Sequence, residues 1–470
     1  MEDRRRSPRA IEIGIVTVIL ILSLAACQQD TQGSSSRPSG TVEDILALRD
    51  RDDLNVLFIL VDTLRADHLT TYGYERDTSP EIDQLAHEGI RFANHISQSS
   101  WTKCSMASLW TGLYPARSRV TRAPDAIPEE AVLPAEIFRD AGFRTSGIWR
   151  NGWIAPNFGF GQGFENYTQP RPGMIDRPQP HEAPNKTLPG TDADIIRSTM
   201  TFLRSYGHER WFLYLHLMDV HQYVYSPDEA LYGTTYLDIY DNSIRWTDGL
   251  IGHLLDELDE RGLRDNTLIV FASDHGEAFG DHGNEGHARD VYAEVTTTPF
   301  ILSLPFRLEP GIVIDSRTAN VDVWPTVLEL IGLSPLESTD GRSRVDDIRV
   351  AGRGTSIPDG LEAEPTFAML DQTWGRDRQD PAPLVAVHQE GWRLFHGTVG
   401  STEPKLFDKR IDPTEQNDVA NEHPKVVESL VSVVEQHLDA SPPPWGDASE
   451  KIELDDMQIN QLRALGYGVQ

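Results

Sequence analysis

The chain has 470 residues, of which 39% are apolar and 8% aromatic, a composition typical of a globular protein and too apolar for a disordered one. Aspartate and glutamate number 73 against 42 lysines and arginines, which gives a formal net charge of −31. Such a chain is a poor partner for nucleic acid, whose phosphates need a basic surface. The simplest explanation of this excess of acidic residues is a charged surface in contact with solvent. An anionic substrate stays open, because a metal ion and histidines can make one pocket locally positive.

The N-terminus has the features of an export signal. A basic start, MEDRRRSPR, precedes an apolar run of 14 residues from Ile13 to Ala26, which is short for a membrane span of about 20 residues. The sequence LAAC, which ends at Cys27, resembles a bacterial lipoprotein box, whose cysteine is lipidated and becomes the mature N-terminus. The expected lipoprotein signal segment covers residues 1–27. Because Gln28 follows, the resemblance implies a lipid-anchored protein at the outer membrane or periplasmic face. An uncleaved anchor or a plain signal peptide stays open.

Residues 28–52 are expected to form a flexible tether, because their first part is polar and rich in serine and glycine. Apolar runs that suit strands buried on both faces then alternate with helical patterns. The expected strands begin near Asn55 (NVLFILVD) and cover Trp211–Leu217 and Thr267–Ala272, and the expected helices cover Ser79–Glu88, Ala131–Ala141, Ala193–Tyr206 and Leu237–Arg261. This alternation predicts a doubly wound α/β fold with a large mixed or mostly parallel sheet sandwiched by helices.

The C-terminal part is expected to form a small α+β subdomain. Residues 336 to about 385 are loop-rich and indicate a boundary. The segments WRLFHG and KLFDKRIDPTE and a helix from about Pro424 to Leu438 follow. We therefore expect a main domain over residues 53–360 and a subdomain over residues 361–470.

Polar side chains follow the expected strands, at the edge where ligands bind in open α/β sheets. Asp62 follows the first strand, His221 lies just after the second, and Asp274 and His275 follow the third. Carboxylates and imidazole can hold a divalent cation, which acts as a Lewis acid and lowers the pKa of a bound hydroxyl. A turn at Gly276 would let Asp274 and His275 converge on one ion.

Three histidines, His221, His282 and His287, can neutralise a charged ester oxygen or protonate a leaving group. Each residue alone also has a plainer explanation, since an aspartate after a strand is often a helix N-cap and a single histidine is often structural. The combination of VDTLRAD upstream with SDHG downstream favours a functional site.

Ordered motifs along the chain resemble those of the sulfatase family, part of the alkaline phosphatase superfamily. The matching stretches are NVLFILVDTLRADHLTTYGY, TSPEIDQLAHEGIRFANHIS, WTKCSMASLWTGLYP, DNTLIVFASDHGEAFGDHG, VDVWPTVLELIGL, LFDKRIDPTEQND and the terminal LRALGY. They extend over about residues 53 to 470. The resemblance implies a central sheet flanked by helices, a small C-terminal antiparallel sheet, and metal-dependent hydrolysis of sulfuric or phosphoric esters.

The resemblance also implies metal ligands. Asp62 matches the first metal-binding aspartate of the family's Asp-Asp pair, whereas Thr63 stands where the second aspartate usually is. Asp274 and His275 match the late metal pair, which is Asp-Asn in many members.

Substrate contacts are implied in the same way. His221 matches the histidine that contacts the substrate ester, and His287 falls where many members have a lysine; both are expected to serve catalysis and substrate binding. His282 is nearby and is expected to contact substrate.

The nucleophile is where the chain departs most from the family. Typical members carry Cys-x-Pro-x-Arg, whose cysteine becomes formylglycine, followed by a segment that ends in Thr-Gly. Counting back from Thr111 and Gly112 places the nucleophile at Thr102, with Cys104 at the proline position and Met106 at the arginine position. We expect Cys104 to be an unmodified bystander. Thr102 can also cap the following helix, whose N-terminus favours a bound anion.

A threonine nucleophile resembles the phosphotransferring branches of the superfamily, including lipoteichoic acid synthases. One divalent cation is then expected among Asp62, Thr102, Asp274 and His275. Ligands rich in oxygen suit Mn²⁺, Mg²⁺ or Ca²⁺, with Zn²⁺ as a further option. Thr102 would attack phosphorus or sulfur to give a covalent phospho- or sulfo-threonine, while a histidine protonates the leaving alcohol.

The expected substrate is an anionic ester: a sulfated or phosphorylated sugar, lipid or small molecule. The loops from Trp149 to Asn185 suit either a sugar or lipid headgroup site or simple packing. Two other functions stay open. One is a transferase that moves a phospho-substituent onto envelope glycans or lipids, and the other is a non-catalytic carbohydrate-binding lipoprotein.

Overall fold

The computed structural model describes residues 37–173, 190–226, 228, 230–355, 364–373, 379–398, 403–439, 442–446 and 450–453. The chain divides into two units, residues 1–37 and 38–470, and the fold described below is that of the second. The expected export signal with Cys27, part of the loops before Asn185 and the terminal LRALGY lie outside the described residues. Within the described ranges, no helix combines the length and the apolar character needed to cross a membrane.

An eight-stranded sheet forms the centre of the second unit, in the order β11-β2-β10-β7-β1-β6-β4-β5. β10 pairs antiparallel with both of its neighbours, and the other pairs are parallel. The expected mixed, mostly parallel sheet is thus confirmed. The strands are β1 (Asn55–Val61), β2 (Ile90–Ile96), β4 (Arg144–Trp149), β5 (Asn166–Thr168), β6 (Trp211–Leu217), β7 (Thr267–Ala272), β10 (Phe300–Ser303) and β11 (Ile312–Ala319).

Alternate side chains of the central strands enter two separate cores. On β1, Val56, Phe58 and Leu60 belong to one core, and the residues between them belong to the other. Since successive side chains of a strand point to opposite faces, each core lies on one face of the sheet. Every residue of β1, β6 and β7 is buried. This burial explains why these strands are continuous apolar runs in the sequence.

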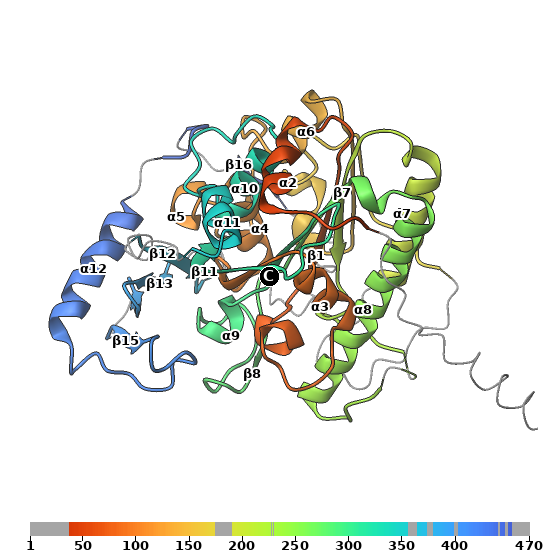
Figure 1. The fold of residues 1–470 in the computed structure, drawn as a ribbon. Helices are drawn as coiled ribbons and strands as arrows, with labels where there is room; N and C mark the ends of the chain where they lie inside the picture. Colours follow the sequence, from red (N-terminus) through yellow and green to blue (C-terminus); the bar gives the residue numbers. More distant parts are fainter. Residues whose placement is uncertain are drawn as a thin grey trace, which may run out of the picture. The chain divides into compact units, whose positions relative to one another are not determined.

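Helices cover both faces of the sheet (Figure 1). One core includes α2 (Val42–Ala47), α4 (Thr102–Thr111), α6 (Pro134–Asp140), α10 (Val323–Leu330) and α11 (Val345–Gly352), and the other includes α3 (Pro80–His87), α7 (Asp192–Tyr206) and α8 (Tyr236–Glu260). The four helices expected from the sequence correspond to α3, α6, α7 and α8. At the start of α8, Thr235 and Asp238 bond each other's backbone N–H groups in a capping box.

A four-stranded antiparallel sheet follows in the C-terminal part, in the order β12-β13-β14-β15. Its strands are β12 (Thr366–Asp371), β13 (Pro383–Gln389), β14 (Trp392–Gly397) and β15 (Lys405–Asp408). Helix α12 (Pro424–Leu438) shares a core with this sheet through Leu430 and Val434. The expected small α+β unit is confirmed.

Shorter elements connect these parts. They are α5 (Pro115–Ser118), α9 (Ala293–Thr296), β3 (Asp125–Ala126), which pairs with β16 (Glu450–Lys451), and β8 (Ala278–Phe279), which pairs with β9 (Glu285–Gly286). The β8–β9 hairpin follows the loop after β7, so it begins close to the carboxyl edge of the main sheet.

Two expectations about loops were wrong in part. The stretch 336–385 contains α11 and β12, and the end of the expected tether contains α2. These elements are six to eight residues long, too short to show a clear period in the sequence. Tertiary packing stabilises them, since Ile45 of α2 and Ile348 of α11 are fully buried.

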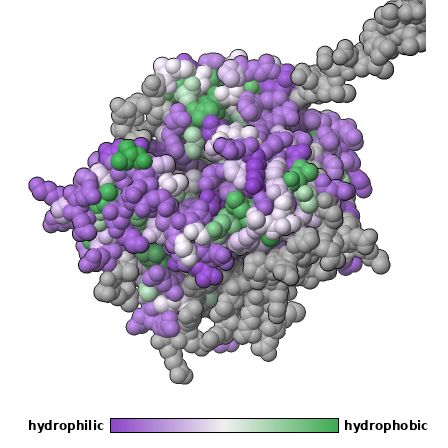
Figure 2. Space-filling model, turned by 90° about the horizontal axis from the view of Figure 1, so that it is seen from below, coloured by the Kyte–Doolittle hydropathy of each residue, from purple (hydrophilic) through white to green (hydrophobic). Residues whose placement is uncertain are grey.

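The surface is largely hydrophilic, as the many acidic residues in the sequence predict. Figure 2 shows a face dominated by hydrophilic residues, on which hydrophobic groups are small and separated. Among the described residues, the large apolar side chains that are exposed are Val132, Leu231, Val313 and Ile411. These positions are scattered along the chain, as is usual for a solvated protein surface.

Trp324 of α10 lies at the centre of the aromatic packing on one face of the sheet. Its ring centre is 5.2 Å from those of Phe58 and Trp110 and 5.5 Å from that of Phe212. We expect Trp324→Ala to lower the free energy of unfolding by about 3–5 kcal/mol, because the lost ring leaves a cavity. Urea denaturation followed by circular dichroism checks this. Leu231→Ala is the control, at a position 61% exposed, and equal effects of the two variants would contradict the prediction.

Candidate active site

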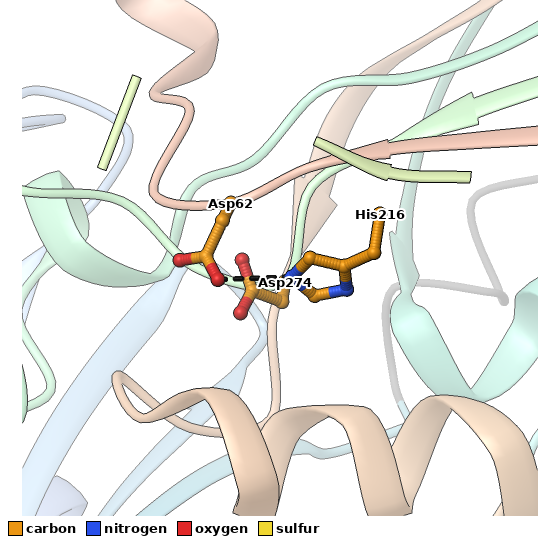
Figure 3. Close-up of side chains that lie close together, drawn as sticks. All are labelled: Asp62, His216 and Asp274. Carbon is orange, nitrogen blue, oxygen red and sulfur yellow. Dashed lines mark hydrogen bonds and ion pairs between the residues drawn. The ribbon is translucent and has the colours of Figure 1, made fainter. Parts of the chain in front are cut away.

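Three buried side chains meet at the carboxyl end of the central strands (Figure 3). Asp62 follows β1, Asp274 follows β7, and His216 lies near the end of β6; one possible ligand atom of each lies within 4.8 Å of the others. In the described part of the chain, Asp62 Oδ1 and Asp274 Oδ2 are buried and have no hydrogen-bond partner. Buried polar atoms rarely lack a partner. The two oxygens therefore fit a bound cation.

His275 adds an imidazole to this cluster. Its Nδ1 lies 2.9 Å from the carbonyl oxygen of Gly276, so Nδ1 carries the proton and Nε2 has a free lone pair. Nε2 lies 3.4 Å from Asp274 Oδ2, 3.9 Å from Asp62 Oδ1 and 3.2 Å from Thr102 Oγ1. The structure thus places the four expected metal ligands in one cluster, and this donor set is one that divalent cations accept.

The two carboxylates of the cluster oppose each other electrostatically. Both are fully buried. Burial raises the pKa of Asp274, and the neighbouring charge of Asp62 raises it further. Burial also acts to raise the pKa of Asp62, but His221, His216 and other nearby imidazoles outweigh it and hold this pKa below its usual range. A divalent cation would let both carboxylates stay ionised.

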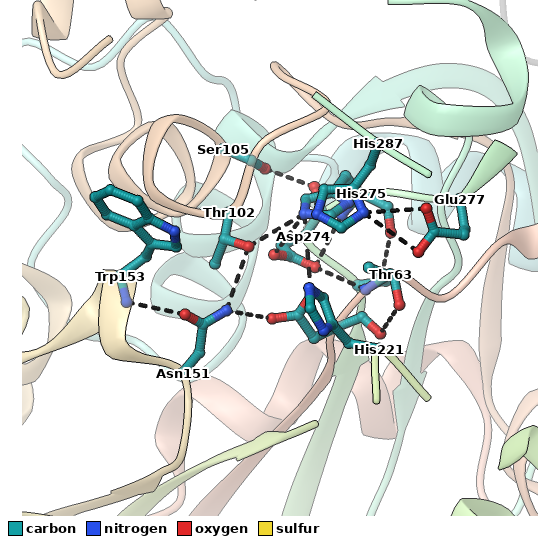
Figure 4. A network of polar contacts seen from close by, with 12 residues as sticks. Thr63, Thr102, Ser105, Asn151, Trp153, His221, Asp274, His275, Glu277 and His287 are labelled. Carbon is teal, nitrogen blue, oxygen red and sulfur yellow. Dashed lines mark hydrogen bonds and ion pairs between the residues drawn. The ribbon is translucent and has the colours of Figure 1, made fainter. Parts of the chain in front are cut away.

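The hydroxyl of Thr102 belongs to the same cluster. Thr102 is the first residue of α4, after the N-cap Trp101, where unpaired backbone N–H groups and the helix dipole favour negative charge. Asn151 Nδ2 donates to Asp62 Oδ2 at 2.6 Å and to Thr102 Oγ1 at 3.3 Å, and its Oδ1 accepts from the Trp153 N–H at 2.9 Å (Figure 4). This amide therefore fixes the hydroxyl relative to the carboxylate.

Thr63 has a strained backbone beside Asp62. Its φ is 60°, a left-handed conformation that is rare for a β-branched residue. Its N–H donates to Asp274 Oδ1 at 3.2 Å, its hydroxyl donates to the Asp62 carbonyl at 2.7 Å, and its carbonyl accepts from the Tyr240 hydroxyl at 2.7 Å. Such strain persists where the surroundings hold it and is common at functional sites. Here the turn holds the Asp274 carboxylate and the main chain of Asp62.

Two more histidines border the cluster (Figure 4). The ring centre of His287 is 4.6 Å from that of His275 and 5.0 Å from that of His221. Burial acts to lower the pKa of His287, but the Glu277 carboxylate, 3.1 Å from its Nδ1, outweighs burial and raises this pKa. Burial lowers the pKa of His221 to about 4. The pKa of one histidine is thus raised and that of the other is lowered, a difference that suits a proton donor and a proton acceptor.

His282 is not brought together with the other expected site residues. Its Nδ1 lies 2.7 Å from Glu294 Oε1, its Nε2 lies 2.9 Å from the Glu415 carbonyl, and its ring stacks on Tyr292. Both nitrogens are engaged by the protein, because the β8–β9 hairpin carries this residue towards the C-terminal subdomain. A role in substrate contact stays a prediction from the resemblance alone.

Cys104 lies two residues after Thr102 but in a different environment. Its side chain is 1% exposed and belongs to the hydrophobic core on one face of the sheet. Burial raises the pKa of the thiol to about 12. The thiol therefore stays protonated near neutral pH and is a poor nucleophile, which agrees with the expectation of a bystander.

Lys103 fixes the start of α4 between these two residues. Its buried Nζ donates to the carbonyls of Ala123 and Asp125, at 2.5 and 2.7 Å, and lies 4.1 Å from the ring centre of Phe158. Burial lowers the pKa of this amine to about 7. The amine ties the first turn of the helix to the 123–125 loop.

Three residues of the cluster were not expected from the sequence: His216, Asn151 and Glu277. His216 left a signal, because a lone polar residue inside the apolar strand WFLYLHL needs a partner when it is buried. Its Nε2 lies 2.9 Å from Asp62 Oδ2, and its Nδ1 lies 2.6 Å from the Tyr214 hydroxyl. Asn151 and Glu277 lie in irregular segments, where no spacing rule distinguishes them.

Buried carboxylates, imidazoles and a hydroxyl at the carboxyl edge of a mostly parallel sheet form a candidate site of the class found in metal-dependent ester hydrolases with an α/β fold. The family model called Sulfatase matches residues 54–333. Because the match covers more than half of the chain, the protein belongs to the sulfatase family, and it is a sulfatase-like ester hydrolase of the alkaline phosphatase superfamily.

Known proteins agree with this assignment. The chain is 24% identical to the N-acetylgalactosamine-6-O-sulfatase of Bacteroides thetaiotaomicron, in a match that covers 81% of this chain and 92% of the relative. Its fold is similar to that of the phosphonate monoester hydrolase of Agrobacterium radiobacter, with a TM-score of 0.67, 20% identity, and coverage of 82% of this chain and 96% of that one. A protein solved in complex with its substrate D-glucosamine-2-N,6-O-disulfate has a TM-score of 0.66, 17% identity, and coverage of 83% and 99%.

The repulsion between the two buried carboxylates predicts how metal binding changes the stability of the protein. In protein stripped with EDTA, we expect Asp274→Asn to keep or raise the melting temperature, because it removes one of two buried like charges. Added Mn²⁺ should stabilise the wild type by about 2.7 kcal/mol at 100 times its Kd and should not stabilise the variant. Thermal unfolding with and without Mn²⁺, Mg²⁺ or Ca²⁺ measures both effects.

Asp346→Asn is the matched control for this experiment, because its side chain is 84% exposed and its substitution removes the same charge. It should respond to metal as the wild type does. If Asp274→Asn responds to metal as fully as the wild type, Asp274 does not help to hold the cation.

Proposed function

We propose that the protein hydrolyses an anionic phosphorus or sulfur ester with Thr102 as the nucleophile. One observation carries the proposal: Thr102 Oγ1 lies 3.2 Å from His275 Nε2 and within the reach of the Asn151 amide, whereas the thiol of Cys104 lies in the core. The hydroxyl is the nucleophilic group in the cluster, and it starts a helix whose N-terminus favours anionic charge.

A divalent cation held by Asp62, Asp274 and His275 would supply Lewis acidity and lower the pKa of the neighbouring hydroxyl. Thr102 Oγ1 then bonds to phosphorus or sulfur as the bond to the leaving oxygen breaks. His221, held neutral, accepts the Thr102 proton. His287, whose pKa the Glu277 carboxylate raises, protonates the leaving alcohol.

Water resolves the covalent intermediate in a second displacement. It attacks the phospho- or sulfo-threonine and gives a proton to His287, which is now neutral. The bond to Thr102 Oγ1 breaks, and the proton stored on His221 returns to that oxygen. Both histidines thereby regain their first protonation states, and the free phosphate, phosphonate or sulfate is released.

Phosphorus esters are the substrates that this nucleophile suits best. A formylglycine sulfate can collapse by elimination from its second hydroxyl, but a threonyl sulfate has no such hydroxyl and must wait for water. We therefore propose faster turnover of phosphate or phosphonate monoesters than of sulfate esters. The similar proteins include both types by name, an N-acetylgalactosamine-6-O-sulfatase and a phosphonate monoester hydrolase.

The nucleophile is tested by substitutions at two neighbouring positions. We expect Thr102→Ala to lower kcat by about 10³-fold or more, because no other hydroxyl replaces the attacking oxygen. Thr102→Ser keeps the hydroxyl and should retain most of the activity. Cys104→Ala should keep kcat within about twofold and cost stability only, on the order of 1–2 kcal/mol. The measurement is steady-state turnover of aryl phosphate, phosphonate and sulfate monoesters, with release of the corresponding free phosphate, phosphonate or sulfate as evidence of hydrolysis rather than transfer.

The reverse pattern, with loss of activity in Cys104→Ala and none in Thr102→Ala, would restore the formylglycine mechanism. Mass spectrometry of the peptide with Cys104 gives a second check, because formylglycine differs from cysteine in mass. An unmodified cysteine in fully active protein agrees with the proposal.

We also propose that the protein acts from a lipid anchor at Cys27 on the bacterial envelope. The support is the sequence LAAC after a basic and apolar leader. A radiolabelled fatty acid fed to the cells should label the wild type and not Cys27→Ala, because the thiol is the attachment point of the lipid, and kcat should not change. Gel autoradiography with activity assays checks this, and a wild type without label would contradict the anchor.

A further inference from the structure

The motif LFDKRIDPTEQND, residues 406–418, contains one carboxylate that is deeply buried. Glu415 is 1% exposed. Its Oε1 accepts from Lys409 Nζ at 2.7 Å and pairs with Arg393 Nη1 at 3.1 Å, and its Oε2 accepts from the Ala293 N–H at 2.9 Å. The first two partners belong to the C-terminal subdomain. Ala293 belongs to the main domain, so Glu415 joins the two.

Residues 282–297, here called the histidine segment, receive contacts on both sides of His287. Before it, His282 Nε2 donates to the Glu415 carbonyl at 2.9 Å. After it, Arg393 Nη2 donates to the Val291 carbonyl at 2.6 Å and to Thr296 Oγ1 at 2.8 Å. Glu415 and its partner Arg393 therefore hold the histidine segment at several points.

The turn that presents Glu415 is itself tightly constrained. Glu415 has a φ of 60°, which is uncommon outside glycine, asparagine and aspartate. The carboxylate of Asp412 accepts from the N–H groups of Gln416 and Asn417 at 3.0 and 2.9 Å. A residue stays in such a conformation only where its surroundings fix it, so the Glu415 carboxylate has a set position.

We propose that Glu415 is a positioning residue, which acts through the histidine segment to keep His287 beside Glu277 and His275. This inference rests on the proposed function, because it takes His287 as the group that protonates the leaving alcohol. None of the contacts found for Glu415 in the described residues reaches Asp62, Thr102 or the other expected metal ligands. Any effect of Glu415 on the reaction must therefore pass through the segment.

The test variant is Glu415→Gln, which keeps the size of the side chain and an acceptor for the Ala293 N–H. It removes the charge that Arg393 and Lys409 face. We expect kcat/KM for an aryl phosphate to fall about 10- to 100-fold, the usual range for supporting residues and small displacements, and we expect the loss to lie in kcat. Hydrogen–deuterium exchange should become faster in the 282–297 peptide and stay unchanged in β1 and β7.

The matched control is Asp408→Asn, from the same motif. Asp408 pairs with Arg410, 2.7 Å away, so the variant also removes one charge of an ion pair in the subdomain. It should change neither kcat nor exchange in the histidine segment. If Glu415→Gln fails to fold, as judged by its melting curve, Glu415→Asp replaces it and should show the same pattern more weakly.

A double variant separates positioning from general damage. In the His287→Ala background, Glu415→Gln should lower kcat by less than about twofold, since the group it positions is already gone. Three results would each overturn the inference. They are effects of the two substitutions on kcat that add fully, a normal kcat in Glu415→Gln, and a lower kcat in Glu415→Gln with unchanged hydrogen–deuterium exchange in the histidine segment. If His287→Ala alone leaves kcat unchanged, the proposed function fails at His287 and the inference falls with it. A large loss in His287→Ala with none in Glu415→Gln overturns the inference alone.

Discussion

The constraint on which this structure depends is the placement of two carboxylates where neither can reach water. Strands β7, β1 and β6 are adjacent and parallel, so Asp62 and Asp274 leave the sheet at the same edge. Both are fully buried, and each has one oxygen without a protein partner in the described part of the chain. A bound cation would relieve this arrangement, because it would let both buried carboxylates stay ionised. The N–H of the strained Thr63 bonds the Asp274 carboxylate and the amide of Asn151 bonds that of Asp62, so these two groups hold the carboxylates in place.

Helix geometry explains why Thr102 and Cys104 differ so much although only one residue separates them. Successive residues of an α-helix turn by about 100°, so positions i and i+2 point to nearly opposite sides. Because the hydroxyl of Thr102 faces the cluster, the thiol of Cys104 must face the core, where it is found. No rotation of α4 could bring both to the metal ligands, and Lys103, bonded to the carbonyls of Ala123 and Asp125, resists any rotation. Which of the two side chains can reach the cluster therefore depends on the orientation of the whole helix.

Residues placed by a regular element could be predicted from the sequence, and residues placed by irregular backbone could not. Continuous apolar runs predicted β1, β6 and β7 with their bounds, and the residues just after two of those strands, Asp62 and Asp274, lie in the cluster. Asn151 depends on a loop whose path no period predicts. His282 is close to His287 in the sequence, but the β8–β9 hairpin turns it towards Glu415, so its role in substrate contact stays a prediction. Both ring nitrogens of His216 contact other protein groups. Such contacts could have been predicted, because a single polar residue in a buried apolar strand needs partners.

Charge finally explains how so acidic a protein can accept an anionic ester. The site holds three carboxylates, Asp62, Asp274 and Glu277, and among its histidines His287 is the one whose pKa is raised. Without a cation this balance is negative, and a phosphate or sulfate would be repelled as it is by the rest of the surface. A divalent ion brings the balance close to neutral and leaves the imidazoles to face the substrate. The cation is then needed for substrate binding as well as for chemistry, so its loss should raise KM along with lowering kcat, whereas a loss confined to kcat would mean that the ion only activates the hydroxyl.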